Sequence, residues 1–221
     1  MDGIKAQQKV WLGYGKAASK IGLVYKVYRS INGINPITAP NYLYEVFLST
    51  TQAWSYKNPN KFSMNSWLMV VDGTKVSPGD YLVANNSLTN DIYYIASKQH
   101  LQPILGIKCD RTIDVIAVTD TGFETNKGFT GYAAEDLPPK SNQIIMQACP
   151  ASFIIGSKGE SSSVNIPFDT KMPWYSVYLP YLNKHIESGY VLVDDKSKRF
   201  LLSGNQKTDN GWKLIATTLG A

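Results

Sequence analysis

The sequence is poor in the residues that most metal and catalytic sites use. Its 221 residues include only two cysteines and two histidines, and neither pair has the short spacing at which zinc ligands occur. Cys109 and Cys149 each lie in an apolar stretch, which is typical of small buried side chains and not of a disulfide framework. We therefore expect no metal, no cofactor and no fold that depends on disulfides.

Catalytic motifs are missing as well. The sequence has no G-x-S-x-G nucleophile elbow, no H-E-x-x-H motif and no phosphate-binding loop. Neighbouring carboxylates such as Asp194 and Asp195 are more simply explained as turn residues than as an acid and base pair. No apolar run approaches the roughly 20 residues of a transmembrane helix. These absences predict a protein that is not an enzyme and does not span a membrane.

Composition and patterning favour strands over helices. Hydrophobic residues make up 43% of the chain and aromatic residues 12%, with 14 tyrosines, whereas only 18% of the residues are charged. Short alternating or apolar segments are separated by breakers such as Pro78-Gly79-Asp80 and Asn210-Gly211. The expected strands are residues 23–28, 42–49, 67–72, 80–85, 92–97, 104–109, 112–118, 144–149, 174–179, 190–193, 199–203 and 212–217.

This pattern predicts a mainly β fold, with one or two small antiparallel β barrels or sandwiches preceded by an N-terminal arm that contains a short helix. The arm is residues 1–30, and a first β module follows at 31–119. Residues 120–142, rich in Gly, Thr, Asn and Pro, are expected to form a loop or linker. A second β module is expected at 143–221.

A weak internal repeat supports two related modules. Residues 76–83 align with 186–193, and Gly, Leu and Val recur in register. After a polar turn, residues 93–97 align with 199–203. Each copy is typical of a β-hairpin that is entered through a glycine turn. The alternative is that two hairpins of similar composition resemble each other by chance.

The net charge lies at the N-terminus. Residues 1–30 carry six basic side chains against one acidic side chain, and the formal net charge of the whole chain is +5. Acidic protein subunits, nucleic acid phosphates or a targeting machinery could each recognise such a segment, and a plain solvated terminus is the fourth reading. Because no nucleic-acid-binding motif is present, we favour docking on protein. The candidate partner-binding residues are Lys5, Lys9, Trp11, Tyr14, Lys16, Lys20 and Arg29.

Aromatic and amide side chains alternate in one other segment. Flat aromatic rings beside amides suit sugars, which present an apolar face and a rim of hydroxyls. The alternative is that the tryptophans anchor a core or an interface and that the asparagines form a turn. The candidate ligand-binding residues are Trp54, Tyr56, Asn58, Asn60 and Trp67.

A resemblance to a known class of protein is carried by residues 13–22 (GYGKAASKIG) and 25–29, and by shorter motifs at 78–83, 150–152 and 211–214. These segments resemble the uncharacterised virion proteins that are encoded among the structural genes of tailed bacteriophages. The similarity spans most of the chain, although its motifs are short and carry no catalytic signature.

The resemblance implies a non-enzymatic structural subunit that is located in the virion. Its place would be the neck, for example as a head-tail connector, or the tail or the baseplate. Its partners would be other virion structural subunits, with homo-oligomers in the assembly, and not nucleic acid. The alternative function is a carbohydrate-binding module of a receptor-binding device. A hydrolase with an unrecognised site is a third and weaker hypothesis.

Overall fold

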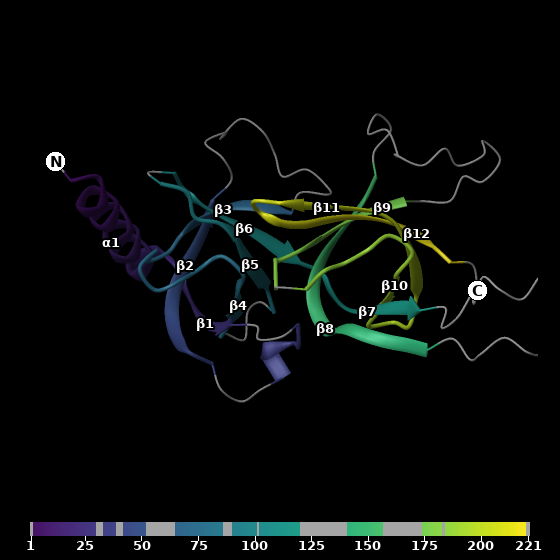
Figure 1. Ribbon diagram of the computed structural model, residues 1–221. Helices are drawn as coiled ribbons and strands as arrows, with labels where there is room; N and C mark the ends of the chain where they lie inside the picture. The colour runs from purple at the N-terminus through teal and green to yellow at the C-terminus, as the bar shows by residue number, and fades with distance from the viewer. Residues whose placement is uncertain are drawn as a thin grey trace, which may run out of the picture.

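The residues that the structure describes form two closed antiparallel barrels of six strands each, with one helix at the N-terminal end (Figure 1). The structure is a computed structural model. It describes residues 2–29, 33–38, 42–51, 65–85, 90–100, 102–119, 141–156, 174–182 and 184–219. The predicted mainly β fold, with one or two small antiparallel barrels or sandwiches, is therefore confirmed and takes the form of two barrels.

One helix and one 3₁₀ turn accompany the strands in the part of the chain that the structure describes. Helix α1 spans Gly3–Ile21, and a single 3₁₀ turn, η1, spans Pro36–Thr38. The strands are β1 (Leu23–Arg29), β2 (Tyr44–Thr51), β3 (Ser66–Val70), β4 (Asp80–Ala84), β5 (Ile92–Ser97), β6 (Ile104–Cys109), β7 (Arg111–Thr119), β8 (Ser141–Ile155), β9 (Trp174–Leu179), β10 (Val191–Asp194), β11 (Arg199–Thr208) and β12 (Gly211–Thr218).

The two barrels share one strand order. Around the first barrel the neighbours are β1-β2-β3-β6-β5-β4, and around the second they are β7-β8-β9-β12-β11-β10. Counted from its own first strand, each barrel therefore has the order 1-2-3-6-5-4. Alternate side chains of each strand point inward and fill the two barrels. Val27, Leu82 and Ile95 lie in the first core, and Val115 and Leu192 lie in the second.

The repeated hairpins lie at equivalent places in the two barrels. Gly79 and Gly189 have φ of 90° and 91°, a backbone conformation that glycine adopts readily. The Gly79 N–H donates to Ile95 O at 2.9 Å, and the Gly189 N–H donates to Leu202 O at 2.7 Å. A β-bulge follows Ile95 in one barrel and Leu202 in the other. The repeat is therefore structural and not a chance resemblance.

The predicted alignment of the second strand of the repeat is wrong by one residue. It matched Ile95 with Leu201, whereas the hydrogen bonds match Ile95 with Leu202. The error arose because the sequence similarity places the aromatic Tyr94 beside Phe200. The strand pairing instead makes Tyr93 equivalent to Phe200, because Leu82 lies opposite Tyr93 and Leu192 lies opposite Phe200.

The barrels divide the chain at a single residue, Asp110, which separates β6 from β7. Two strands belong to another unit than the one predicted for them. β1, which was assigned to the N-terminal arm, closes the first barrel, and β7, which was assigned to the first module, closes the second barrel. Of the expected loop at 120–142, residues 141 and 142 begin β8, and the rest lies outside the described residues.

The second barrel covers one outer face of the first. Tyr28, Tyr81 and Tyr94 alternate with core residues and so point out of the first barrel, yet all three are buried. They pack in one cluster against Tyr178 of β9, and the Tyr81 hydroxyl donates to the Pro150 carbonyl at 3.2 Å. Burial raises the pKa of the Tyr81 and Tyr94 phenols well above its usual value. The barrels therefore form one packed body.

A pair of substitutions tests this interface. Tyr81→Phe should lower the free energy of unfolding by about 1 kcal/mol, because it removes a buried hydrogen bond. Tyr94→Phe should leave it unchanged or raise it, because the Tyr94 hydroxyl is buried without a hydrogen-bond partner among the described residues. Urea unfolding of both variants measures the difference, and equal losses would contradict the packing described.

Candidate interaction surface

Helix α1 lies at the outer end of the first barrel, against β2 and β3 and away from the second barrel (Figure 1). The Asp2 side chain accepts the Ile4 N–H at 3.1 Å and caps the first turn, and the Gly22 N–H donates to Ala18 O at the other end. The predicted short helix is confirmed and is longer than expected. It is followed directly by β1, so no extended arm separates the helix from the barrel.

The helix is fixed to the barrel through Trp11. A Cβ atom at Gly73 would lie 2.5 Å from the indole ring, so only glycine allows this close approach. The Lys98 Nζ lies 4.2 Å from the ring centroid and donates to Val76 O at 2.9 Å. Trp11 also packs against the core of the first barrel. The helix is therefore part of the folded body.

Removing this anchor should destabilise the whole protein. Trp11→Ala is expected to lower the free energy of unfolding by about 2–3 kcal/mol, below the full cost of a buried tryptophan because Trp11 is only half-buried. The matched control is Leu12→Ala, the next residue, which is 49% exposed and should change stability by less than about 0.5 kcal/mol. Thermal or urea unfolding measures both. A Trp11→Ala protein as stable as the control would show that the helix is not anchored.

Four lysines form a stripe along the outward face of α1, here called the lysine stripe: Lys5, Lys9, Lys16 and Lys20. At 3.6 residues per turn they fall within an arc of about 60° and extend over about 22 Å. The buried Gln7 and Ala18 lie on the opposite side of the helix. All four lysines are exposed, and none forms an ion pair within the part of the chain that the structure describes.

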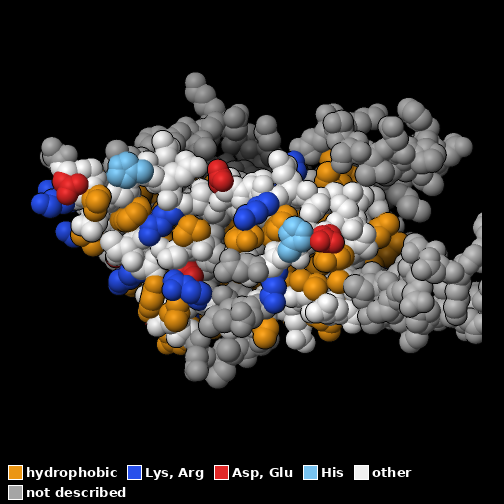
Figure 2. Space-filling model, in the orientation of Figure 1, with side chains coloured by type: hydrophobic (Ala, Val, Ile, Leu, Met, Phe, Trp, Pro, Cys, Tyr) orange, Lys and Arg blue, Asp and Glu red, His pale blue; other side chains and the backbone are white. Residues whose placement is uncertain are grey.

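Figure 2 shows Lys and Arg side chains gathered over the end of the molecule that carries α1. The helix itself contains no acidic residue and Asp2 is used as its cap, while the carboxylate Asp72 of the barrel approaches the helix at Gly15. A rigid row of like charges attracts an acidic partner over several ångströms and weakens with added salt. The lysine stripe is therefore the strongest candidate binding feature among the described residues.

Three of the predicted partner-binding residues have other roles. Trp11 and Tyr14 are half-buried and lie on the side of the helix that faces the barrel. Arg29 is paired with Asp80, whose side chain is only 1% exposed. The Arg29 Nε donates to Asp80 Oδ1 at 2.7 Å and Nη2 donates to Oδ2 at 2.9 Å. This hydrogen bonding raises the pKa of Arg29, so the guanidinium serves the fold.

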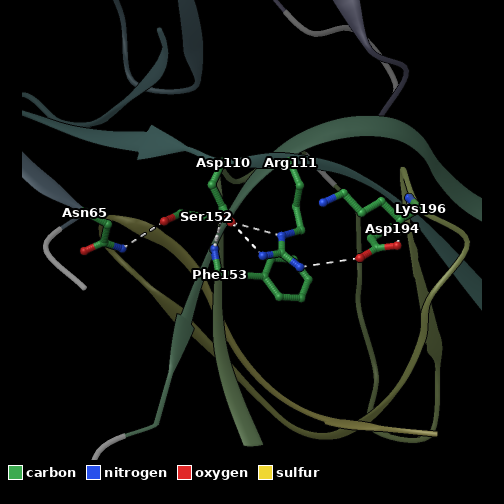
Figure 3. A network of polar contacts seen from close by, with 7 residues as sticks. All are labelled: Asn65, Asp110, Arg111, Ser152, Phe153, Asp194 and Lys196. Carbon is green, nitrogen blue, oxygen red and sulfur yellow. Dashed lines mark hydrogen bonds and ion pairs between the residues drawn. The ribbon is translucent and has the colours of Figure 1, made fainter. Parts of the chain in front are cut away.

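A second buried carboxylate lies where the barrels meet (Figure 3). Asp194 is 1% exposed, accepts the Lys196 N–H at 3.0 Å and lies 3.4 Å from Nη1 of Arg111. Arg111 in turn contacts Asp110, whose Oδ1 accepts the Phe153 N–H at 2.7 Å. These contacts join the residue between the barrels to β7, β8 and the turn after β10. They fix Asp110, the residue between the barrels, to the second barrel, and each of these two carboxylates takes part in a structural contact.

The predicted sugar-binding segment is largely untested. Trp54, Tyr56, Asn58 and Asn60 lie outside the described residues. Trp67 lies in β3 and packs against the core of the first barrel, so it is a structural side chain. The alternative that a tryptophan of this segment anchors a core therefore holds for Trp67.

The cysteines are buried free thiols, as expected from their apolar surroundings. Burial raises the pKa of Cys149 to about 12, so this thiol is protonated and unreactive near neutral pH. Within the described ranges, His, Cys, Asp and Glu form no group of three that could hold a metal ion. No helix there is long and apolar enough to cross a membrane.

A groove beside the lysine stripe was not predicted from the sequence. It has a volume of about 310 Å³ and lies between α1 and the β2 side of the first barrel. Leu12 and Phe47 contribute exposed apolar surface on its two sides, and Lys16 and Lys75 also line it. Side chains alternate between the two faces of β2, and Phe47 is on the outer face. The sequence alone does not show which face of the strand is the outer one, so the exposure of Phe47 could not be predicted.

Comparisons with protein-family models, with curated protein sequences and with solved structures find no match.

Proposed function

We propose that the protein is a non-enzymatic structural subunit that docks on an acidic surface of a neighbouring protein subunit through the lysine stripe of α1. The observation that carries the proposal is a row of four lysines, none of them ion-paired with a described residue, on a helix that is fixed to a barrel. A fixed helix has little conformational entropy left to lose when it binds, so its charges contribute to affinity with a small ordering cost.

The neutrality of the rest of the chain favours a protein partner over nucleic acid. Outside residues 1–30 the basic and acidic side chains balance, whereas nucleic-acid-binding proteins spread basic residues over a broad face. The rigid pairing of two closed barrels also suits an assembly subunit, because closed barrels have few free strand edges that would pair with the wrong chain.

The finer proposal is that this assembly is a tailed-phage virion, with the subunit in the neck, tail or baseplate and present in several copies. It rests on the resemblance of residues 13–22 and 25–29 to virion proteins. Mass spectrometry of density-purified particles tests it: the protein should be present at a constant ratio to a known structural protein. Abundance in infected-cell lysate with absence from particles would contradict the proposal.

A further inference from the structure

The groove beside α1 has the composition of an anchoring pocket. Leu12 is 49% exposed and Phe47 is 44% exposed, and both line the same hollow of about 310 Å³. Exposed apolar side chains that meet in a hollow next to charged residues are typical of the centre of a protein interface. Lys16 belongs both to the groove and to the lysine stripe, so the two features are continuous.

We propose that this groove receives an apolar side chain from an acidic segment of the partner protein, while carboxylates of that segment contact the lysine stripe. This inference rests on the proposed function and names the chemistry of the partner. The partner segment would carry a leucine-like side chain flanked by aspartates or glutamates.

The charges around the groove support an acidic occupant. The groove lining itself is neutral, because Lys16 and Lys75 are balanced by Glu45 and Asp72. Glu45 accepts from Asn85 Nδ2 at 2.9 Å and Asp72 accepts the Thr74 N–H at 2.9 Å, and both are neutral donors that leave the negative charges in place. The excess positive charge beside the hollow is that of Lys5, Lys9 and Lys20 in the lysine stripe, and a basic segment would be repelled by it.

Binding of two synthetic peptides to the full chain tests the inference. Both peptides are short and rich in glutamate, and they differ only at one central position, which is leucine in one and glycine in the other. Fluorescence anisotropy should give a Kd for the leucine peptide about tenfold lower, because the leucine side chain leaves water. Phe47→Ser and, independently, Leu12→Ser should remove that preference. Lys16→Ala should weaken binding of both peptides.

The control variant is Ile155→Ser, an exposed apolar residue of the second barrel at 63% exposure, which should keep the preference. Thermal unfolding confirms that each variant is folded. Equal affinity of the wild type for the two peptides, including no binding to either, would overturn the inference. Displacement of both peptides by a tighter-binding DNA duplex would also overturn it and assign the surface to nucleic acid.

The role proposed for the groove can be wrong while the proposed function is right. If Phe47→Ser enters particles at the wild-type copy number while loss of the lysine stripe prevents entry, the groove has no part in docking and the lysine stripe does. If neither change affects entry, the proposed function itself is wrong.

Discussion

Replacing Arg29 with alanine should lower the free energy of unfolding by about 3 kcal/mol, since removing one partner of a buried ion pair leaves the other charge uncompensated. Asp80 is only 1% exposed and receives two hydrogen bonds from the guanidinium. The effect should lie at the lower end of the usual range because the Arg29 side chain is 49% exposed and Asp80 keeps the Ser77 N–H as a donor. Urea unfolding gives the value.

Two further variants show that the loss comes from the stranded charge. Adding Asp80→Asn to Arg29→Ala should recover part of the stability, because the amide is uncharged and still accepts the Ser77 N–H. Arg199→Ala, an exposed arginine without an ion pair among the described residues, should change stability by less than about 0.5 kcal/mol. If the double variant is less stable than Arg29→Ala, the buried-charge explanation is incorrect.

The strands could be predicted because local patterns determine them. Alternating apolar residues between glycine, proline and asparagine turns are visible without any tertiary information, and β5, β6 and β9 begin and end where the sequence indicates. β8 was predicted too short because Pro150 normally interrupts a strand. In the structure Pro150 pairs with Thr112 near an irregularity of the ladder, and the strand continues to Ile155.

The closure of the barrels could not be predicted in the same way. Which strands are neighbours depends on contacts between distant segments, so β1 and β7 were placed in the wrong units. The hairpin repeat was the only sequence signal for the duplication, and it covered only β4 and β5 of the first barrel with β10 and β11 of the second.

The interaction surface was predicted in part. The lysines of α1 stand out in the sequence because nothing acidic lies between them. The anchoring of Trp11 depends on Gly73 and Lys98, which are far away in the chain, so the sequence predicted an N-terminal arm and not a helix fixed to the barrel. Arg29 was predicted to bind a partner for the same reason, because Asp80, with which it pairs, lies 51 positions away in the sequence.

Because the helix is fixed to the barrel, docking is better tested by substitution than by deletion. Deleting residues 1–20 would remove Trp11 from the core of the first barrel and confuse misfolding with lost docking. Replacing Lys5, Lys9, Lys16 and Lys20 with alanine removes the charge alone. Alanine has the highest helix propensity, and the lysines of the first turns oppose the helix dipole, so stability should be unchanged or higher.

Loss of these four charges should weaken docking by about 0.8–4 kcal/mol, which is about fourfold to a thousandfold, since each exposed ion pair contributes about 0.2–1 kcal/mol and the four act together. The control is the double variant Lys196→Ala and Lys198→Ala, which removes exposed lysines from a turn of the second barrel.

Copy number per purified particle, measured by quantitative mass spectrometry for a quadruple variant whose melting temperature is not lowered, tests the central claim most directly. The account predicts that the quadruple lysine variant is depleted from particles at least about fourfold while the control is present at the wild-type level. Wild-type copy number of the quadruple variant would contradict docking through the lysine stripe.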